Sequence, residues 1–239
     1  MKLDILAFAA HPDDVELSCS GTIIQHIRMG YKVGIVDLTS GELGTRGSAE
    51  LRDVESKDAS AVMGIHAREN LRMKDGFFRN DEEHQRELIR VIRKYQPDIV
   101  LCNAISDRHI DHGRAAQLEA DSCFLSGLVK IETKGEDGAI QAAWRPKSIY
   151  HYIQDHFIIP DIAIDITDVW EQKIKAIECF RSQFFDPNSN APVTPIATKE
   201  FWEFLPARAM DMGRIIGAKY AEGFTVKRAP GVKDLKSLI

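Results

Sequence analysis

The sequence predicts an α/β protein with a Rossmann-like, mostly parallel sheet, helices on both faces of that sheet, and a single domain spanning residues 1–239. Short apolar runs alternate with helical patterns in the first half of the chain, which favours parallel strands joined by crossover helices. The chain is 44% hydrophobic and 28% charged, which is usual for a globular domain of this length. No internal repeat or low-complexity tract divides it.

The first half contains the clearest elements. Residues 3–9 form a short apolar run, which fits a strand buried on both faces. Isoleucines at helical spacing before Gly30 predict a helix, and the β-branched run that follows predicts a second strand. The elements predicted after the first strand are a helix over 19–29, a strand over 31–38, a helix over 49–63, a short strand near 69–72, a helix over 81–95, a strand over 98–102 and a helix over 113–128.

The second half is less regular. Residues 132–147 are polar and Gly-rich and are predicted to form an excursion of the chain rather than a linker between domains. Residues 148–153 and 162–166 are strand-like. Thr167 could cap a helix that runs to about Phe184. The last predicted elements are a proline-containing loop over 186–195 and a helix over 199–220.

Composition excludes several classes of protein. Lys and Arg number 31 against 36 Asp and Glu, so a net charge of −5 argues against general binding to nucleic acid or to a membrane surface. The apolar N-terminal run is interrupted by Asp4 and followed by acidic residues, which a signal peptide would not tolerate. The four cysteines lie far apart with no C-x-x-C pair. We therefore expect a cytoplasmic protein with reduced thiols and with neither nucleic acid nor membrane as a partner.

Two polar clusters follow predicted strands. His11 to Glu16 comes directly after the first strand, and Asp107 to His112 comes shortly after the strand over 98–102. Ligands of open α/β sheets bind beyond the carboxyl ends of the strands, and parallel strands end at the same edge. The two clusters are therefore expected to converge, although they are about a hundred residues apart.

Imidazole and carboxylate groups are zinc ligands, and hydrolytic zinc sites keep three protein ligands and one open position. A further carboxylate can act as general base, and a second histidine can stabilise an oxyanion. His109 suits the last task, because the neighbouring Asp111 carboxylate would favour its imidazolium form. Taken singly, an Asp-Asp pair at a strand end can be a helix cap, and a histidine can be an ordinary surface or core residue.

The two clusters also resemble a known family. The string over 10–16 (AHPDDVE) together with 109–112 (HIDH) resembles the LmbE-like (PIG-L) family of zinc-dependent N-acetylglucosamine deacetylases. The stretches 41–47, 107–109 and 182–184 look like the branch that deacetylates the glucosaminyl-malate precursor of bacillithiol. The resemblance extends over essentially the whole chain.

The resemblance implies a role for each motif residue. It implies zinc ligation by three residues, general-base catalysis by Asp13, stabilisation of the tetrahedral intermediate by His109, and orientation or charging of that histidine by Asp111. The three implied ligands are His11, Asp14 and His112. The donor set would accept Zn²⁺, with Fe²⁺ or another divalent metal possible. Relatives of this kind form hexamers, so the resemblance implies a homo-oligomer.

Three arginines are candidates for substrate binding. Arg46 and Arg52 could bind a carboxylate such as malate in a bidentate manner, and Arg108 adjoins the second cluster. Arg52 could instead pair with Glu50 or Glu55 on its own predicted helix.

The leading hypothesis is a zinc-dependent hydrolase that removes acetyl from an N-acetylglucosaminyl conjugate, with the malate conjugate as first candidate. The alternatives are a deacetylase or amidase of another N-acetyl sugar or thiol conjugate, and a sugar-binding module with a structural metal. A closed structural zinc site usually has four ligands, often cysteines, and neither cluster contains one.

Overall fold

In the computed structural model, which describes residues 1–238, seven strands form one sheet in the order β3-β2-β1-β4-β5-β7-β6. They are β1 (Ile5–Ala9), β2 (Val33–Thr39), β3 (Ala67–Met73), β4 (Ile99–Cys102), β5 (Ser148–Tyr152), β6 (Ile162–Asp165) and β7 (Ala221–Thr225). The first five strands run parallel, and β7 is antiparallel to both of its neighbours. The predicted mostly parallel α/β class is confirmed.

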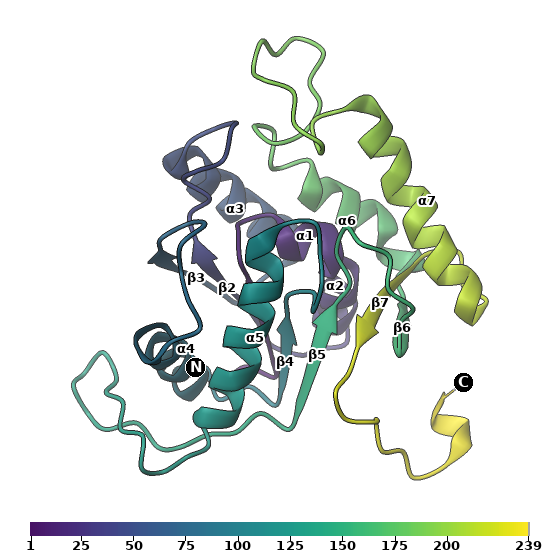
Figure 1. Ribbon diagram of the computed structural model, residues 1–239. Helices are drawn as coiled ribbons and strands as arrows, with labels where there is room; N and C mark the ends of the chain where they lie inside the picture. The colour runs from purple at the N-terminus through teal and green to yellow at the C-terminus, as the bar shows by residue number, and fades with distance from the viewer. Residues whose placement is uncertain (239) are drawn as a thin grey trace.

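Helices cover both faces of the sheet (Figure 1). They are α1 (Asp14–Ser18), α2 (Ser20–Arg28), α3 (Ala49–Met63), α4 (Glu82–Tyr95), α5 (Ile110–Leu125), α6 (Trp170–Ile177) and α7 (Lys199–Ile216), with 3-10 turns η1 (Thr167–Val169) and η2 (Leu235–Leu238). Successive side chains of β1 point to opposite faces of the sheet, so this strand contributes to the hydrophobic core on each face. Ile5 and Ala7 pack in the core with α2 and α6, whereas Leu6 and Phe8 pack in the core with α4 and α5. No described helix is long and apolar enough to cross a membrane.

The strand order places a crevice next to β1. The chain proceeds from β1 to β2 and β3 on one side, and then returns to place β4 on the other side of β1. At such a reversal the loops after the two neighbouring strands separate, and this leaves a space beyond their carboxyl ends. The two polar clusters follow these two strands.

Two predicted helices were wrong in their boundaries. The helix that carries the second cluster begins at Ile110 rather than at Gly113, so Asp111 and His112 lie in its first turn. The helix predicted to run from Thr167 to Phe184 is the short α6, and the Thr167 hydroxyl accepts a hydrogen bond from the backbone of Tyr220 instead of capping a helix.

The strand β7 was not predicted from the sequence. Its residues, AEGFT, carry no apolar alternation, and the strand is buried because it lies between β5 and β6 in the folded sheet.

Candidate metal and active site

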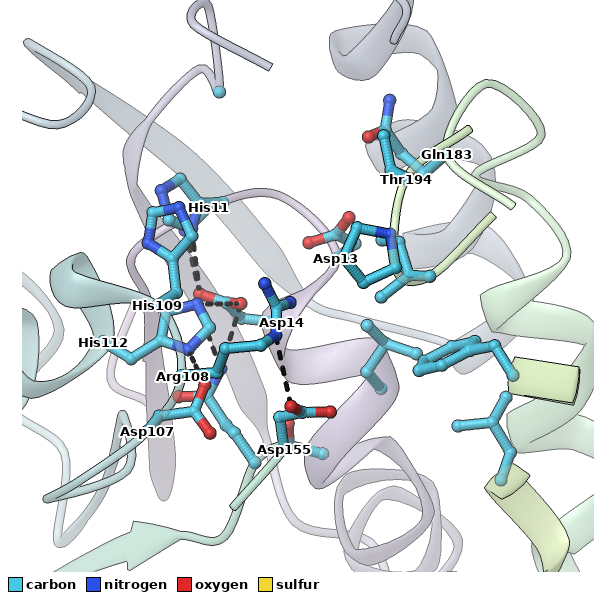
Figure 2. Close-up of a pocket in the computed structure, with 18 of the residues that line it drawn as sticks. His11, Asp13, Asp14, Asp107, Arg108, His109, His112, Asp155, Gln183 and Thr194 are labelled. Carbon is cyan, nitrogen blue, oxygen red and sulfur yellow. Dashed lines mark hydrogen bonds and ion pairs between the residues drawn. The ribbon is translucent and has the colours of Figure 1, made fainter. Parts of the chain in front are cut away.

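A cavity of about 460 Å³ opens beyond the carboxyl ends of β1 and β4. Its walls come from both polar clusters, from the loop after β2, from the segment 194–196, and from one face of α7. Figure 2 shows the three histidines of the clusters grouped on one side of this pocket, with Asp13 and Gln183 further along it. The expected convergence of the two clusters is therefore present in the fold.

The Asp14 carboxylate lies between two histidines. Its Oδ1 is 3.0 Å from Nε2 of His112, and its Oδ2 is 3.7 Å from Nδ1 of His11. The two imidazole rings are 5.5 Å apart, centroid to centroid. His11 follows β1, Asp14 begins α1, and His112 lies in the first turn of α5, so three elements bring the implied ligands together.

The remaining nitrogen of each histidine faces a carboxylate. Nδ1 of His112 is 2.5 Å from Asp107 Oδ2. Nε2 of His11 is 3.1 Å from Asp75 Oδ1 and 3.4 Å from Asp111 Oδ2. A metal-binding histidine almost always donates its second N–H to such a partner, which sets the tautomer and the orientation of the ring. Both histidines are therefore held in the manner of metal ligands.

The pKa values of the two histidines and of Asp14 reflect the several carboxylates around the histidines. Burial lowers the pKa of His112, but the charge of Asp14 and the hydrogen bond with Asp107 outweigh it and raise the pKa to about 9. Burial likewise opposes a charge on His11, yet hydrogen bonds with neighbouring carboxylates, chiefly Asp111, raise its pKa well above the usual value. Burial would raise the pKa of Asp14, but the two histidines hold it well below its usual range. The cluster thus attracts positive charge, as protons or as a cation.

Two sets of donor atoms lie close enough together to hold a divalent metal, and each contains only part of the implied ligand set of His11, Asp14 and His112. Nitrogens of His11, His109 and His112 lie within 4.8 Å of one another, and so do ligand atoms of His11, Asp75 and Asp111. Mixed imidazole and carboxylate donors suit zinc and Fe²⁺, and donor type alone does not choose between them.

Asp13 occupies a strained backbone position at the start of α1. Its φ is 115°, in a region that side-chain-bearing residues rarely adopt, and such strain is concentrated at functional sites. Its side chain is buried and lines the cavity, with Oδ2 3.5 Å from Nη1 of Arg52. Burial raises the pKa of Asp13 to about 7, although the charge of Arg52 lowers it. The group therefore combines burial with a proton affinity suited to proton transfer near neutral pH.

Arg52 contacts both Asp13 and the backbone of Pro12. Its Nη1 donates to the Pro12 carbonyl at 3.0 Å, and its Nη2 donates to Oε1 of Gln183. These contacts replace the pairing with Glu50 or Glu55 that the helix spacing allowed, because Arg52 points from α3 into the cavity wall.

His109 contacts the backbone of Asp111, while the Asp111 side chain lies toward His11. The Asp111 carboxylate accepts hydrogen bonds from the Gly76 backbone and from Arg114 and faces His11, whereas its own backbone N–H donates to Nδ1 of His109 at 3.3 Å. Burial lowers the pKa of His109, and the charges of the two neighbouring histidines lower it further. The charge of Asp111 raises the pKa of His109, as expected, but burial and the two histidines outweigh it.

The other two arginines are already engaged. The guanidinium of Arg46 donates to four backbone carbonyls and one hydroxyl, those of Ser182, Phe184, Ala191, Pro192 and Ser189. Arg108 is more exposed and donates to Asp155 Oδ2 at 3.2 Å. Both line the cavity, but Arg46 chiefly holds the loop over 182–192 in place.

Three further residues, which were not among the predicted site residues, support the cluster. Asn103 donates to Asp14 Oδ2 at 3.1 Å, Gln154 donates to Asp14 Oδ1 at 3.0 Å, and Asp75 contacts His11. Each follows the end of a parallel strand: β4, β5 and β3 respectively. All three positions obey the strand-end rule, which holds for every parallel strand of the sheet.

The chain matches the family model for PIG-L, described as GlcNAc-PI de-N-acetylase, over residues 6–122. This range contains both polar clusters. A solved structure of a conserved protein from Thermus thermophilus is 31% identical, covers 97% of this chain and 98% of its own, and superposes with a TM-score of 0.85.

Two further relatives have described activities. The diacetylchitobiose deacetylase of Thermococcus kodakarensis is 29% identical over 95% of this chain and 84% of its own length. The 4-oxalmesaconate hydratase of Pseudomonas putida is 27% identical over 93% of this chain and 84% of its own length. Relatives on this scaffold thus include a sugar deacetylase and a hydratase.

Proposed function

Because the chain belongs to the PIG-L family of de-N-acetylases, we propose that it is a metal-dependent hydrolase that removes acetyl from an N-acetylglucosaminyl conjugate. The observation that carries this proposal is the grouping of His11, Asp14 and His112 at one wall of a cavity that Asp13 also lines. We take N-acetylglucosaminyl-malate as the first substrate candidate, on the resemblance to the bacillithiol branch.

The three implied ligands would hold the metal, with zinc as first candidate. When bound, a divalent cation lowers the pKa of water and polarises a carbonyl oxygen. The neighbouring carboxylates Asp75, Asp107 and Asp111 would keep the two ligand histidines in the required tautomers.

Asp13 would be the general base. It takes a proton from the attacking water while the water oxygen bonds to the acetyl carbon. Collapse of the tetrahedral species breaks the C–N bond, and the same carboxyl group returns the proton to the departing amine. The products are a free amine and acetic acid, which loses its proton to water as acetate. Arg52 limits the movement of Asp13 and favours its carboxylate form.

His109 would donate a hydrogen bond to the developing oxyanion. Its Nδ1 accepts the Asp111 backbone N–H, so the neutral ring carries its proton on Nε2. This neutral donor requires no imidazolium, in agreement with the lowered pKa of His109.

The test is an assay of amine release with N-acetylglucosaminyl-malate, N-acetylglucosaminyl-inositol and free N-acetylglucosamine, before and after chelation and after addition of Zn²⁺ or Fe²⁺. Metal-dependent release from at least one compound is expected, with the malate conjugate best. Release that chelation leaves unchanged, or no release from any compound, would contradict the proposal. The hydratase relative provides a second candidate activity, and hydration of 4-oxalmesaconate in the same samples would identify it.

A further inference from the structure

One face of α7 forms a wall of the cavity. The α7 residues that line it recur at helical spacing and are apolar with one exception; they are Phe201, Phe204, Leu205, Arg208, Ala209 and Met212. Arg208 is thus the single charged residue in this stripe. An arginine on the inward face of an amphipathic helix calls for a partner.

Arg208 has no such partner within the part of the chain that the structure describes. Its Nη2 is buried and donates to no described acceptor, and no ion pair of this residue is present among residues 1–238. The other basic residues that line the cavity all have partners: Arg46 with backbone carbonyls, Arg52 with Asp13 and Gln183, Arg108 with Asp155, and Lys173 with Glu222.

The two acids whose charges act on Arg208 each hydrogen-bond to another group. Asp155 accepts a hydrogen bond from Arg108, and Asp107 accepts from His112 and from the backbone of His156. Burial lowers the pKa of Arg208, but these two carboxylates oppose the shift, and a guanidinium remains charged at any physiological pH. A desolvated, unpaired guanidinium nitrogen is costly, and a bound anion would remove that cost.

We propose that Arg208 binds a carboxylate on the part of the substrate that is not hydrolysed, and so selects acidic N-acetyl sugar conjugates over neutral ones. A sugar hydroxyl would satisfy the N–H but leave the charge unpaired, whereas a carboxylate satisfies both. The inference rests on the proposed deacetylase function. It moves the acid-binding role from Arg46 and Arg52, which are engaged, to Arg208 on the α7 wall.

The experiment compares two substrates, N-acetylglucosaminyl-malate and the neutral methyl N-acetylglucosaminide. The variants are Arg208→Gln and Arg208→Lys, and the matched control is Arg214→Gln, which lies exposed on the same helix and outside the cavity lining. The ratio of kcat/KM for the malate conjugate to that for the neutral glycoside should fall roughly 10- to 100-fold in Arg208→Gln. The loss should be mainly in KM, and Arg208→Lys should retain part of the preference because it keeps a cation.

A folded Arg208→Gln enzyme with an unchanged ratio would overturn the inference, as would a native enzyme that uses the neutral glycoside as well as the malate conjugate. If neither compound is hydrolysed, the proposed function fails, and calorimetric binding of the same two compounds still decides the role of Arg208. Preferential binding of the malate conjugate that is lost in Arg208→Gln supports the inference. Equal binding of both compounds by the native protein contradicts it, whatever the stability of the variants.

Discussion

Nδ1 of His112 lies 2.5 Å from Oδ2 of Asp107, so the helix that carries the histidine and the loop that precedes it are joined at the candidate metal site. Asp107 Oδ1 also accepts the backbone N–H of His156, which follows β5. Although burial raises the pKa of Asp107, the hydrogen bonds with His112 and His156 lower it to about 2. The contact orients the ring so that Nε2 of His112 faces Asp14 and would face a metal in the proposed function.

We predict that Asp107→Asn weakens metal binding roughly 10- to 100-fold, because loss of a carboxylate partner of this kind has that effect on ligand histidines. Metal content after dialysis against a graded chelator measures this. The exposed Asp137→Asn serves as the control. Equal retention of metal by the native protein and Asp107→Asn would show that this contact does not support the site.

For the general base, we predict that Asp13→Asn lowers the rate of amine release about 10²- to 10⁴-fold while metal is retained, because an amide cannot accept the proton of water. Rate and metal content are measured on the same preparation. Asp58→Asn, exposed on α3, is the control. Undiminished acetate release from Asp13→Asn would exclude Asp13 as the base.

Arg46 provides a prediction about stability. Replacing it with Gln removes charged hydrogen bonds to the loop over 182–192, so the free energy of unfolding should fall by about 1.5–3 kcal/mol. Proteolysis within this loop should also become faster. Denaturant unfolding and limited proteolysis, with the exposed Arg79→Gln as control, measure both effects. If Arg46→Gln instead changes only the affinity for the malate conjugate, Arg46 acts in substrate binding.

Glu119 provides a prediction about pH. It is fully buried behind the site, its Oε2 accepts the Asn103 backbone N–H, and its Oε1 has no described partner. Burial raises its pKa from 4.5 to about 8. The folded state therefore holds a proton that the unfolded chain releases above pH 4.5, so the stability due to this proton is present below that pH and is lost as the pH rises to about 8.

We predict that Glu119→Gln reduces this loss, since Gln keeps the neutral form at every pH. The unfolding free energy of the native protein should fall between about pH 6 and about pH 9 by more than that of the variant, at a slope of at most about 1.4 kcal/mol per pH unit. Denaturant titrations at both pH values measure the difference, with exposed Glu83→Gln as reference. Parallel pH profiles for native and Glu119→Gln protein would show that Glu119 is ionised in the fold.

Much of the fold was predictable because its first half follows local rules. Apolar runs, helical spacing and glycine stops located β1, β2, α3 and α4 closely, and the rule for strand ends located both polar clusters. The strand β7 could not be found in this way, because its stability comes from its neighbours β5 and β6 rather than from its own pattern.

The sequence by itself determined which chemical groups are present: three histidines, with aspartates beside them, in two strand-end motifs. Only the tertiary structure decided which contacts those groups make. In the fold, the Asp111 carboxylate faces His11 and Arg46 donates to backbone carbonyls. Nη2 of Arg208 has no hydrogen-bond partner among the described residues. The physical reason is that the packing of elements distant in the chain decides which side chains meet. The spacing of residues along one segment carries no information about that packing.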